Sequence, residues 1–192
     1  MRIIAGRLRG RRVHTPEEPG LRPISGRIKQ SLFDIIAGLV PGARFLDLFA
    51  GTGAVGLEAL SRGASFAFFV DFKTELVERI RKNLEATGFA DRGQAQPGNV
   101  LSDLSWIGFR CGVSQFELIF LGPPYKDEGK RPLAYSRKAL ENVVAAGLLA
   151  PGGLVISQHH VKEELSAPPG LKMLRREKYG DSYLSFFRGE PR

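Results

Sequence analysis

Residues 45–56 read FLDLFAGTGAVG, and this pattern indicates the class of fold. It begins as an apolar run, breaks into glycines, and continues at helical spacing, with Val55 and Ala59 four apart and Leu57 and Leu60 three apart. This order predicts a buried parallel strand that feeds a helix through a glycine turn. Glycine lets a ligand approach the backbone closely, and the start of a helix presents free N–H groups. We therefore expect a cofactor-binding loop here.

The chain is basic, with 192 residues, 28 Lys and Arg against 20 Asp and Glu, and a net charge of +8. Its length predicts one domain with a sizeable core. The charge favours a polyanionic partner such as nucleic acid, although an ordinary basic surface has the same composition. The single cysteine, Cys111, excludes an internal disulfide and a cysteine-based zinc site. The three histidines are not spaced as metal ligands, so we expect no metal.

Neither a signal region nor a membrane span is visible in the sequence. The N-terminus is charged and lacks an apolar run, and no apolar run elsewhere is long enough to cross a bilayer. We therefore expect a cytoplasmic protein with no membrane contact, and we expect it to act as a monomer.

Residues 1–30 are predicted to form a basic extension ahead of the main domain at 31–192. The apolar residues Ile3, Ile4 and Val13, separated by glycines, predict a short β-hairpin that carries arginines. Arginine forks bind phosphate oxygens bidentately, so the extension is expected to grip a nucleic-acid backbone; a solvated tail would carry the same charges. The side chains expected to hold phosphates are Arg7, Arg9, Arg11, Arg12, Arg22 and Lys29.

The rest of the chain alternates strands and helices. Strands are predicted at about 44–49, 66–71, 94–97, 116–121, 154–158, 171–178 and 182–188. Helices are predicted from the cap at Ser25 to Pro41, from the glycine loop to Arg62, through 101–104, and at about 133–146, with 105–115 irregular. A further helix carries Leu76, Val77, Ile80 and Leu84 on one face and stops at Gly88. The fold class is therefore α/β, a doubly wound and mostly parallel sheet whose ligands lie at the carboxyl ends of its strands. The last two strands form an antiparallel hairpin around residues 179–181.

Two carboxylates flank the glycine loop. Residues 51–56 fit the dinucleotide pattern G-x-G-x-x-G, and Asp71 ends the next strand, where it can accept from ribose hydroxyls. This pattern suits either NAD or S-adenosylmethionine (SAM). Asp47, just before the loop, would repel a pyrophosphate but attract the ammonium of SAM, which favours SAM. Asp47 would equally suit a cap on the N–H groups of the loop.

A second loop, Pro123-Pro124-Tyr125, ends the predicted strand at 116–121. The prolines fix the loop and leave carbonyls that can accept from an exocyclic amine. The aromatic ring can stack on a base that has been pulled out of its helix. The loop therefore indicates methyl transfer to the amine of a base, although a rigid turn with a packed tyrosine would have the same sequence.

Over nearly its whole length the chain resembles the bacterial small-subunit ribosomal RNA guanine-N2 methyltransferases. The stretches that carry the resemblance are residues 1–6, 21–23, 31–33, 47–54, 56–64, 123–125, 149–153 and 179–181. The resemblance implies a Rossmann-like, seven-stranded, SAM-dependent methyltransferase fold with an RNA-gripping N-terminal extension. It also implies methyl transfer to the N2 amine of a guanine, with ribosomal RNA or the small ribosomal subunit as partner.

The resemblance also implies the roles of individual residues. We expect the methionine end of SAM to lie over residues 51–53, the ribose to bind Asp71, and the adenine to lie by Asn99 and Val100. The second loop, residues 122–125, is called the acceptor loop from here on. It should direct the amine with carbonyls at Gly122 and Pro123. The cofactor-binding residues are then Asp47, Phe49, Ala50, Gly51, Thr52, Gly53, Asp71, Phe72, Asn99 and Val100, and the catalytic residues are Gly122, Pro123, Pro124 and Tyr125.

The chain departs from the family at four polar positions. Gly122 stands where the family has an Asp, Asn99 and Gln158 replace acids after two strands, and Gly26 replaces an Asp. A lost partner for a desolvated amine costs about 1–3 kcal/mol. One alternative is therefore a catalytically weakened, methyltransferase-like RNA-binding protein. Others are a DNA or RNA adenine-N6 type amino-methyltransferase, which shares Pro-Pro-Tyr, and an NAD-linked oxidoreductase, which shares only the glycine pattern.

Overall fold

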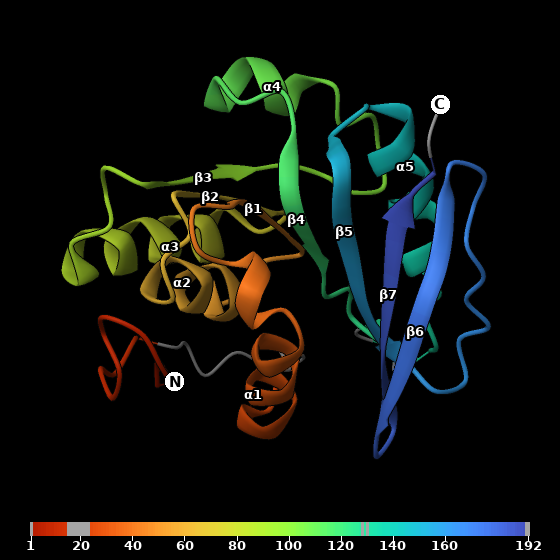
Figure 1. Cartoon of the computed structure of the whole chain (residues 1–192), viewed down its shortest axis with the longest axis horizontal. Helices are drawn as coiled ribbons and strands as arrows, with labels where there is room; N and C mark the ends of the chain where they lie inside the picture. The colour runs from red at the N-terminus through yellow and green to blue at the C-terminus, as the bar shows by residue number, and fades with distance from the viewer. Residues whose placement is uncertain (1, 15–23, 128, 130, 191–192) are drawn as a thin grey trace.

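The computed structural model describes residues 2–14, 24–127, 129 and 131–190, and its centre is one seven-stranded sheet (Figure 1). The strand order is β3-β2-β1-β4-β5-β7-β6. Strands β1 to β5 are parallel, and β7 lies antiparallel between β5 and β6. The strands are β1 (Arg44–Leu48), β2 (Phe66–Asp71), β3 (Gly93–Pro97), β4 (Phe116–Leu121), β5 (Leu149–His160), β6 (Leu171–Tyr179) and β7 (Ser182–Gly189). The doubly wound sheet with a C-terminal antiparallel hairpin, predicted from the sequence, is confirmed.

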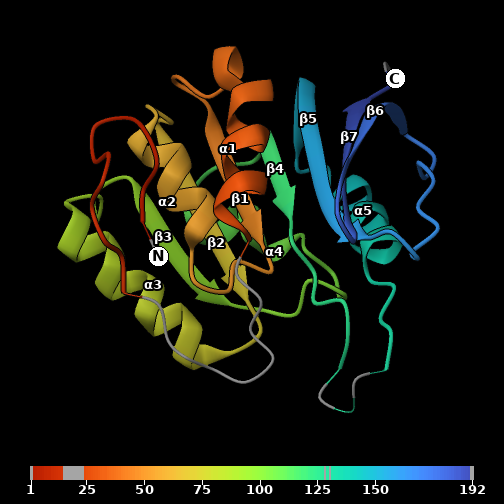
Figure 2. The same cartoon turned by 90° about the horizontal axis from the view of Figure 1, so that it is seen from below.

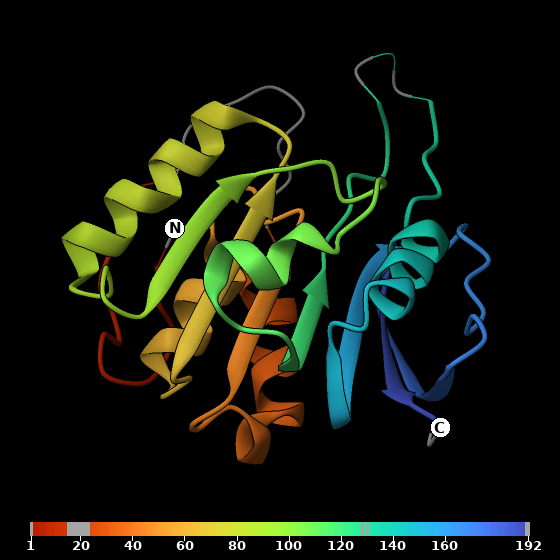
Figure 3. The same cartoon turned by 90° about the horizontal axis from the view of Figure 1, so that it is seen from above.

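Helices cover both faces of the sheet. Figure 2 shows α1 and α2 in front of the strands, and Figure 3, from the opposite side, shows α4 and α5. Neighbouring residues of β1 point to opposite faces, so Phe45 packs with the helices of one face and Leu46 with those of the other. This explains why the strand is apolar without alternation. The helices are α1 (Gly26–Ile35), the short 3-10 helix η1 (Ala37–Leu39), α2 (Ala54–Ser61), α3 (Thr74–Thr87), α4 (Trp106–Cys111) and α5 (Ser136–Ala145).

Two helix ends have the capping residues that the sequence predicts. Ser25 caps α1, where its hydroxyl accepts from the backbone N–H of Ile28 at 3.2 Å. Helix α3 ends at Gly88, whose φ of +71° suits glycine. The single helix predicted from Ser25 to Pro41 is instead divided, because α1 ends at Ile35 and η1 follows.

The segment between β3 and β4 contradicts the sequence prediction. A helix was expected through 101–104 and irregular chain at 105–115, whereas α4 begins at Trp106. Side chains hold the segment before α4 in turns, since Asn99 Oδ1 accepts from the N–H of Leu101 and Asp103 Oδ1 from that of Ser105. Such local bonds compete with helix formation and move the helix start along the chain.

Residues 2–14 form a minimal hairpin that packs on the sheet domain. One antiparallel bridge joins Arg2 to Arg12, and the apolar Ile3 and Val13 are buried in the same core cluster as residues of α1 and α2. At Gly6, with φ +80°, a β-carbon would lie 1.9 Å from the Ser61 carbonyl oxygen, so only glycine permits this approach. The predicted boundary at residue 30 falls inside α1, which shares the same core.

Two further observations concern the described part of the chain. None of its helices is long and apolar enough to cross a membrane. It also holds no group of three or more His, Cys, Asp or Glu side chains that could bind a metal ion.

Candidate cofactor and acceptor site

The glycine loop after β1 concentrates unusual backbone conformations. Phe49, Gly51 and Gly53 have positive φ values of 59°, 55° and 74°, and the Gly53 N–H donates to the Ala50 carbonyl at 2.8 Å. A positive φ is uncommon for a residue such as Phe49 and marks a tightly determined turn. The side chains of Ala50 and Thr52 are buried. The loop therefore presents its backbone, rather than these side chains, at the carboxyl edge of the sheet.

Asp71 ties this loop to the end of β2. Its Oδ2 accepts from the Gly51 N–H at 2.7 Å, and its Oδ1 accepts from the Lys73 N–H at 3.0 Å. Burial raises the pKa of Asp71 above its usual value, against the effect of these backbone bonds. A carboxylate has about four acceptor sites, so these two bonds leave capacity for hydroxyl donors. Beside it, Phe72 is 74% exposed and offers an aromatic face at the same edge.

Asp47 lies beneath the loop, with only 1% of its surface exposed. Its Oδ2 accepts from the Gly56 N–H, in the first turn of α2, at 2.9 Å. The pKa of Asp47 is raised to about 8, mainly by burial; the bond from the Gly56 N–H acts to lower it, and the nearby charge of Asp71 acts to raise it. This geometry favours the alternative that the sequence left open, a cap on the N–H groups that follow the loop.

Asn99 and Val100 follow β3, where the adenine was expected. The Asn99 side chain is exposed, and its Oδ1 already accepts from the Leu101 N–H at 2.9 Å. Val100 is 2% exposed and packs in the core on the α4 side of the sheet. Any contact between Val100 and a cofactor must therefore come from its backbone.

The acceptor loop lies directly beside the glycine loop. The Gly122 N–H donates to the carbonyl of Leu48, the last residue of β1, at 3.2 Å, which extends the pairing of β4 with β1 one residue past the end of β4. Pro123 is buried and Pro124 exposed. The two loops that the sequence singled out therefore leave neighbouring strands at the same point.

Tyr125 is held by residues of β5 and β7. Its hydroxyl accepts from Gln158 Nε2 at 3.0 Å and donates to Ser182 Oγ at 3.0 Å, and its ring meets that of His160 edge to face at 5.5 Å. The hydroxyl end is thus fixed against the C-terminal hairpin. Tyr125 is therefore a packed tyrosine, as in the alternative interpretation of this loop as a rigid turn. The loop nevertheless lies at the carboxyl edge of the sheet.

Lys29 is not available to RNA. The residue is 2% exposed, its Nζ lies 2.9 Å from Glu58 Oε2, and it donates to the Arg2 carbonyl at 3.0 Å. The buried Glu58 carboxylate also accepts from the N–H groups of Ile4 and Ala5. A buried charge is costly unless it is paired, so this lysine is committed to fixing the N-terminal segment. The prediction that Lys29 holds a phosphate is wrong.

The other predicted phosphate ligands differ in their surroundings. Arg7, Arg9, Arg11 and Arg12 are exposed on the N-terminal hairpin, and the Arg11 guanidinium donates to the Ala86 carbonyl at the end of α3. Arg22 lies outside the described residues.

Sequence reasoning gave no role to the turn between β6 and β7. The β7 strand runs antiparallel to β5, which brings Ser182 to the carboxyl edge and against Tyr125, 57 residues earlier in the chain. The pattern Tyr179-Gly180-Asp181 was the available signal, but it indicated a tight hairpin and a part of the family resemblance, with no role in the site.

The fold and the pair of loops define the class of SAM-dependent α/β methyltransferases. Among solved structures, the chain is similar to "Putative methyltransferase yhhF from Escherichia coli", with a TM-score of 0.80, 27% identity, and coverage of 100% of this chain and 99% of that one. The chain belongs to the family described as "Conserved hypothetical protein 95", whose model matches residues 1–188.

Two curated relatives extend over most of the chain. "Ribosomal RNA small subunit methyltransferase D" of Escherichia coli (strain K12) is 34% identical over 182 residues, which cover 93% of this chain and 84% of that protein. "Putative rRNA methyltransferase YlbH" of Bacillus subtilis is 31% identical over 189 residues, covering 98% of each. These likenesses confirm the family resemblance inferred from the sequence.

Proposed function

We propose that this protein is a SAM-dependent methyltransferase that modifies the exocyclic N2 amine of a guanine in small-subunit ribosomal RNA. The observation that carries the proposal is the bond from the Gly122 N–H to the Leu48 carbonyl, which sets the acceptor loop against the glycine loop. A methyl donor over one loop and an amine over the other are then neighbours. The relatives named above support the choice of ribosomal RNA.

The residues of the glycine loop fit SAM. The positive-φ turn at residues 49–53 exposes backbone to a ligand, Asp71 has acceptor capacity for ribose hydroxyls, and the exposed Phe72 offers a face to adenine. Asn99 and the backbone of Val100 complete the adenine end. Asp47 acts from beneath the loop, where a cation above the loop would favour its ionised form. When bound, SAM would supply a methyl group activated by a positively charged sulfur, and a neutral thioether would be the leaving group when that methyl carbon is transferred to an amine nitrogen.

The chain's own contribution to catalysis is positioning. The carbonyls at Gly122 and Pro123 accept from the amine and fix its direction. Pro123 and Pro124 hold the loop rigid, and Tyr125, anchored by Gln158 and Ser182, keeps its ring in one place.

The arginines of the N-terminal hairpin bind RNA phosphates in this proposal. Arg7, Arg9, Arg11 and Arg12 are exposed on one short segment, which the Lys29–Glu58 pair fixes to the sheet domain. Ribosomal RNA or the small ribosomal subunit is the partner. We place the protein in the cytoplasm, acting as a monomer.

The glycine at position 122 supports a second candidate function, that of a catalytically weakened methyltransferase that still binds RNA. The position lacks the carboxylate that the family places next to the amine. Tritium transfer from labelled SAM to undermethylated small ribosomal subunits tests the proposal, and a thermal shift with SAM shows that the protein is folded and loaded. Label above background supports the enzyme, whereas background label with a normal thermal shift supports the weakened protein.

A further inference from the structure

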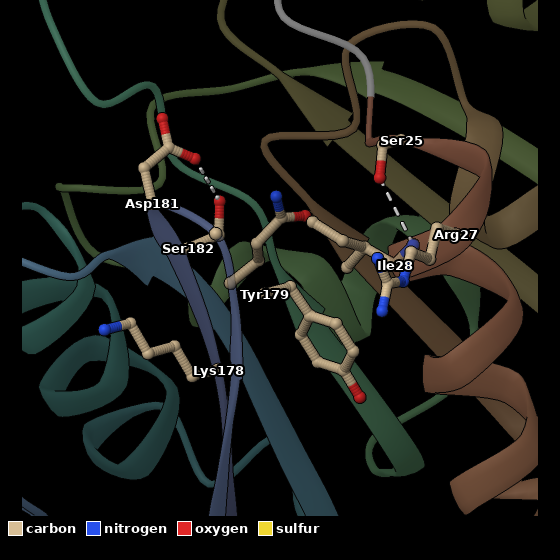
Figure 4. A pocket seen from close by; sticks show the side chains of 9 residues that line it. Ser25, Arg27, Ile28, Lys178, Tyr179, Asp181 and Ser182 are labelled. Carbon is tan, nitrogen blue, oxygen red and sulfur yellow. Dashed lines mark hydrogen bonds between the residues drawn. The ribbon is translucent and has the colours of Figure 1, made fainter.

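A cavity of about 310 Å³ lies between the start of α1 and the turn that joins β6 to β7 (Figure 4). Its lining includes Arg27 of α1, Gln158 at the end of β5, and Tyr179, Asp181 and Ser182 of the hairpin. Ligand pockets begin at about 300 Å³, so the cavity is of a size for one small planar group such as a nucleobase.

The cavity adjoins the acceptor loop. Gln158 and Ser182 both line it, and both bond to the hydroxyl of Tyr125 at 3.0 Å. It also lies at the carboxyl edge of the sheet, because β6 ends and β7 begins there. A base that presents its amine to the acceptor loop therefore has this cavity beside it.

The cavity has a hydrogen-bond acceptor on its hairpin side and a hydrogen-bond donor on its α1 side. The Tyr125 hydroxyl donates to Ser182 Oγ, and Ser182 Oγ donates to Asp181 Oδ1 at 3.2 Å, so the chain of bonds ends at a carboxylate. The exposed guanidinium of Arg27 comes from α1, and Asp181 comes from the hairpin across the cavity (Figure 4). The ring of Tyr179, whose hydroxyl bonds to that of Ser31, adds an aromatic surface between these walls.

We propose that this cavity receives the acceptor guanine, with Asp181 and Arg27 as the residues that read it. Guanine presents two adjacent donors, N1–H and the N2 amine, which a carboxylate can accept together. It also presents two adjacent acceptors, O6 and N7, which a guanidinium fork matches bidentately. An acceptor wall and a donor wall on opposite sides complement this base.

The same walls reject adenine. Adenine has a lone pair at N1 where guanine has a donor, and an amine at C6 where guanine has an acceptor. It would face Asp181 with a lone pair and Arg27 with a donor, so it would lose the hydrogen bonds that guanine makes to each of these side chains. The carboxylate that the family carries at position 122 is absent here, and Asp181 supplies an acidic acceptor from another element.

This inference rests on the proposed function for the identity of the base, but binding tests it without turnover. The probes are fluorescent ten-nucleotide adenine RNAs with one central guanine, inosine, 7-deazaguanine or adenine. Inosine lacks the N2 amine, and 7-deazaguanine lacks the N7 acceptor. The proteins are the wild type, Asp181→Asn, Arg27→Gln, and the matched control Glu177→Gln, which changes one charge on the same hairpin outside the cavity.

We expect the wild type and E177Q to bind the guanine probe about 10- to 100-fold more tightly than the adenine probe. D181N should lose the preference of guanine over inosine, and R27Q that of guanine over 7-deazaguanine, with unchanged melting temperatures. Equal affinities of the wild type for all four probes, or equal losses in D181N on guanine and adenine probes, would overturn the inference. Label transfer on ribosomal subunits is scored separately, so a protein that reads guanine without transferring methyl would contradict only the proposed function.

Discussion

The hydroxyl of Tyr125 donates to Oγ of Ser182 at 3.0 Å, and this bond joins the acceptor loop to the C-terminal hairpin. The two residues lie 57 positions apart in the chain and meet because β7 is antiparallel to β5. The acceptor loop is therefore fixed by the hairpin as well as by its own prolines.

The first prediction concerns that bond. Tyr125→Phe keeps the ring but removes the hydroxyl, which leaves the buried Ser182 without its donor. A net hydrogen bond is worth about 1 kcal/mol, so we expect methyl transfer to fall about 5- to 10-fold with SAM binding unchanged. The measurement is transfer rate at saturating SAM, alongside a thermal shift. Tyr183→Phe on β7 is the control, and equal rates for the two variants would contradict the role of the bond.

The second prediction concerns the missing acid. Gly122 has a negative φ, but a β-carbon there would lie 3.0 Å from the Phe120 ring, so Gly122→Asp should cost about 1 kcal/mol of stability. An added carboxylate beside the amine should raise the transfer rate about 10-fold or more. Gly122→Ala brings the same crowding without an acceptor. If the Asp variant is no faster than the Ala variant, an acid at this position does not limit the reaction.

The third prediction concerns the pH dependence of stability. Burial raises the pKa of Asp47 to about 8, so the folded state holds this proton between about pH 4 and 8 while the unfolded state has lost it. The stabilisation of the wild type is therefore full below about pH 4 and is lost as the pH rises towards 8. Asp47→Asn keeps an acceptor for the Gly56 N–H but does not titrate.

Denaturant unfolding at several pH values, without ligand, measures this difference. The stability of D47N relative to the wild type should rise with pH by at most about 1.4 kcal/mol per unit between pH 4 and 8. A difference that stays constant over this window would show that Asp47 is ionised in the folded protein.

The fourth prediction concerns the arginines of the N-terminal hairpin. Arg9 and Arg12 are exposed, so Arg9→Gln with Arg12→Gln should weaken binding to a small-subunit RNA fragment without unfolding the protein. Each lost phosphate contact reduces the slope of log affinity against log salt by about 0.9. We expect a slope shallower by about 2. Arg110→Gln with Arg188→Gln removes the same charge elsewhere and should leave the slope unchanged; an equal effect of both pairs would indicate general electrostatics only.

The sequence predicted the sheet because its local patterns agree with the final fold. The run at 45–48 is apolar throughout since helices cover both faces, and Gly88 and Ser25 carry the helix-end chemistry expected of them. These properties depend on near neighbours in the chain. They could therefore be assigned before any tertiary contact was known.

The site was less predictable, because its key contacts join distant residues. Lys29 looks like an exposed cation in sequence, and only the packing of α1 on α2 reveals that the buried Glu58 neutralises it. The guanine-sized cavity depends on the distance between α1 and the β6–β7 turn, which no spacing encodes. The role of Asp181 therefore required the three-dimensional structure.

The chemical identity of the product is the direct test of methyl transfer to guanine N2. Small ribosomal subunits that lack guanine-N2 methylation would be incubated with the protein and labelled SAM, and their RNA digested to nucleosides for mass spectrometry. We predict that the label appears in N2-methylguanosine. Label in another nucleoside, or no label from protein that is folded and stabilised by SAM, would contradict methyl transfer to guanine N2 by this protein.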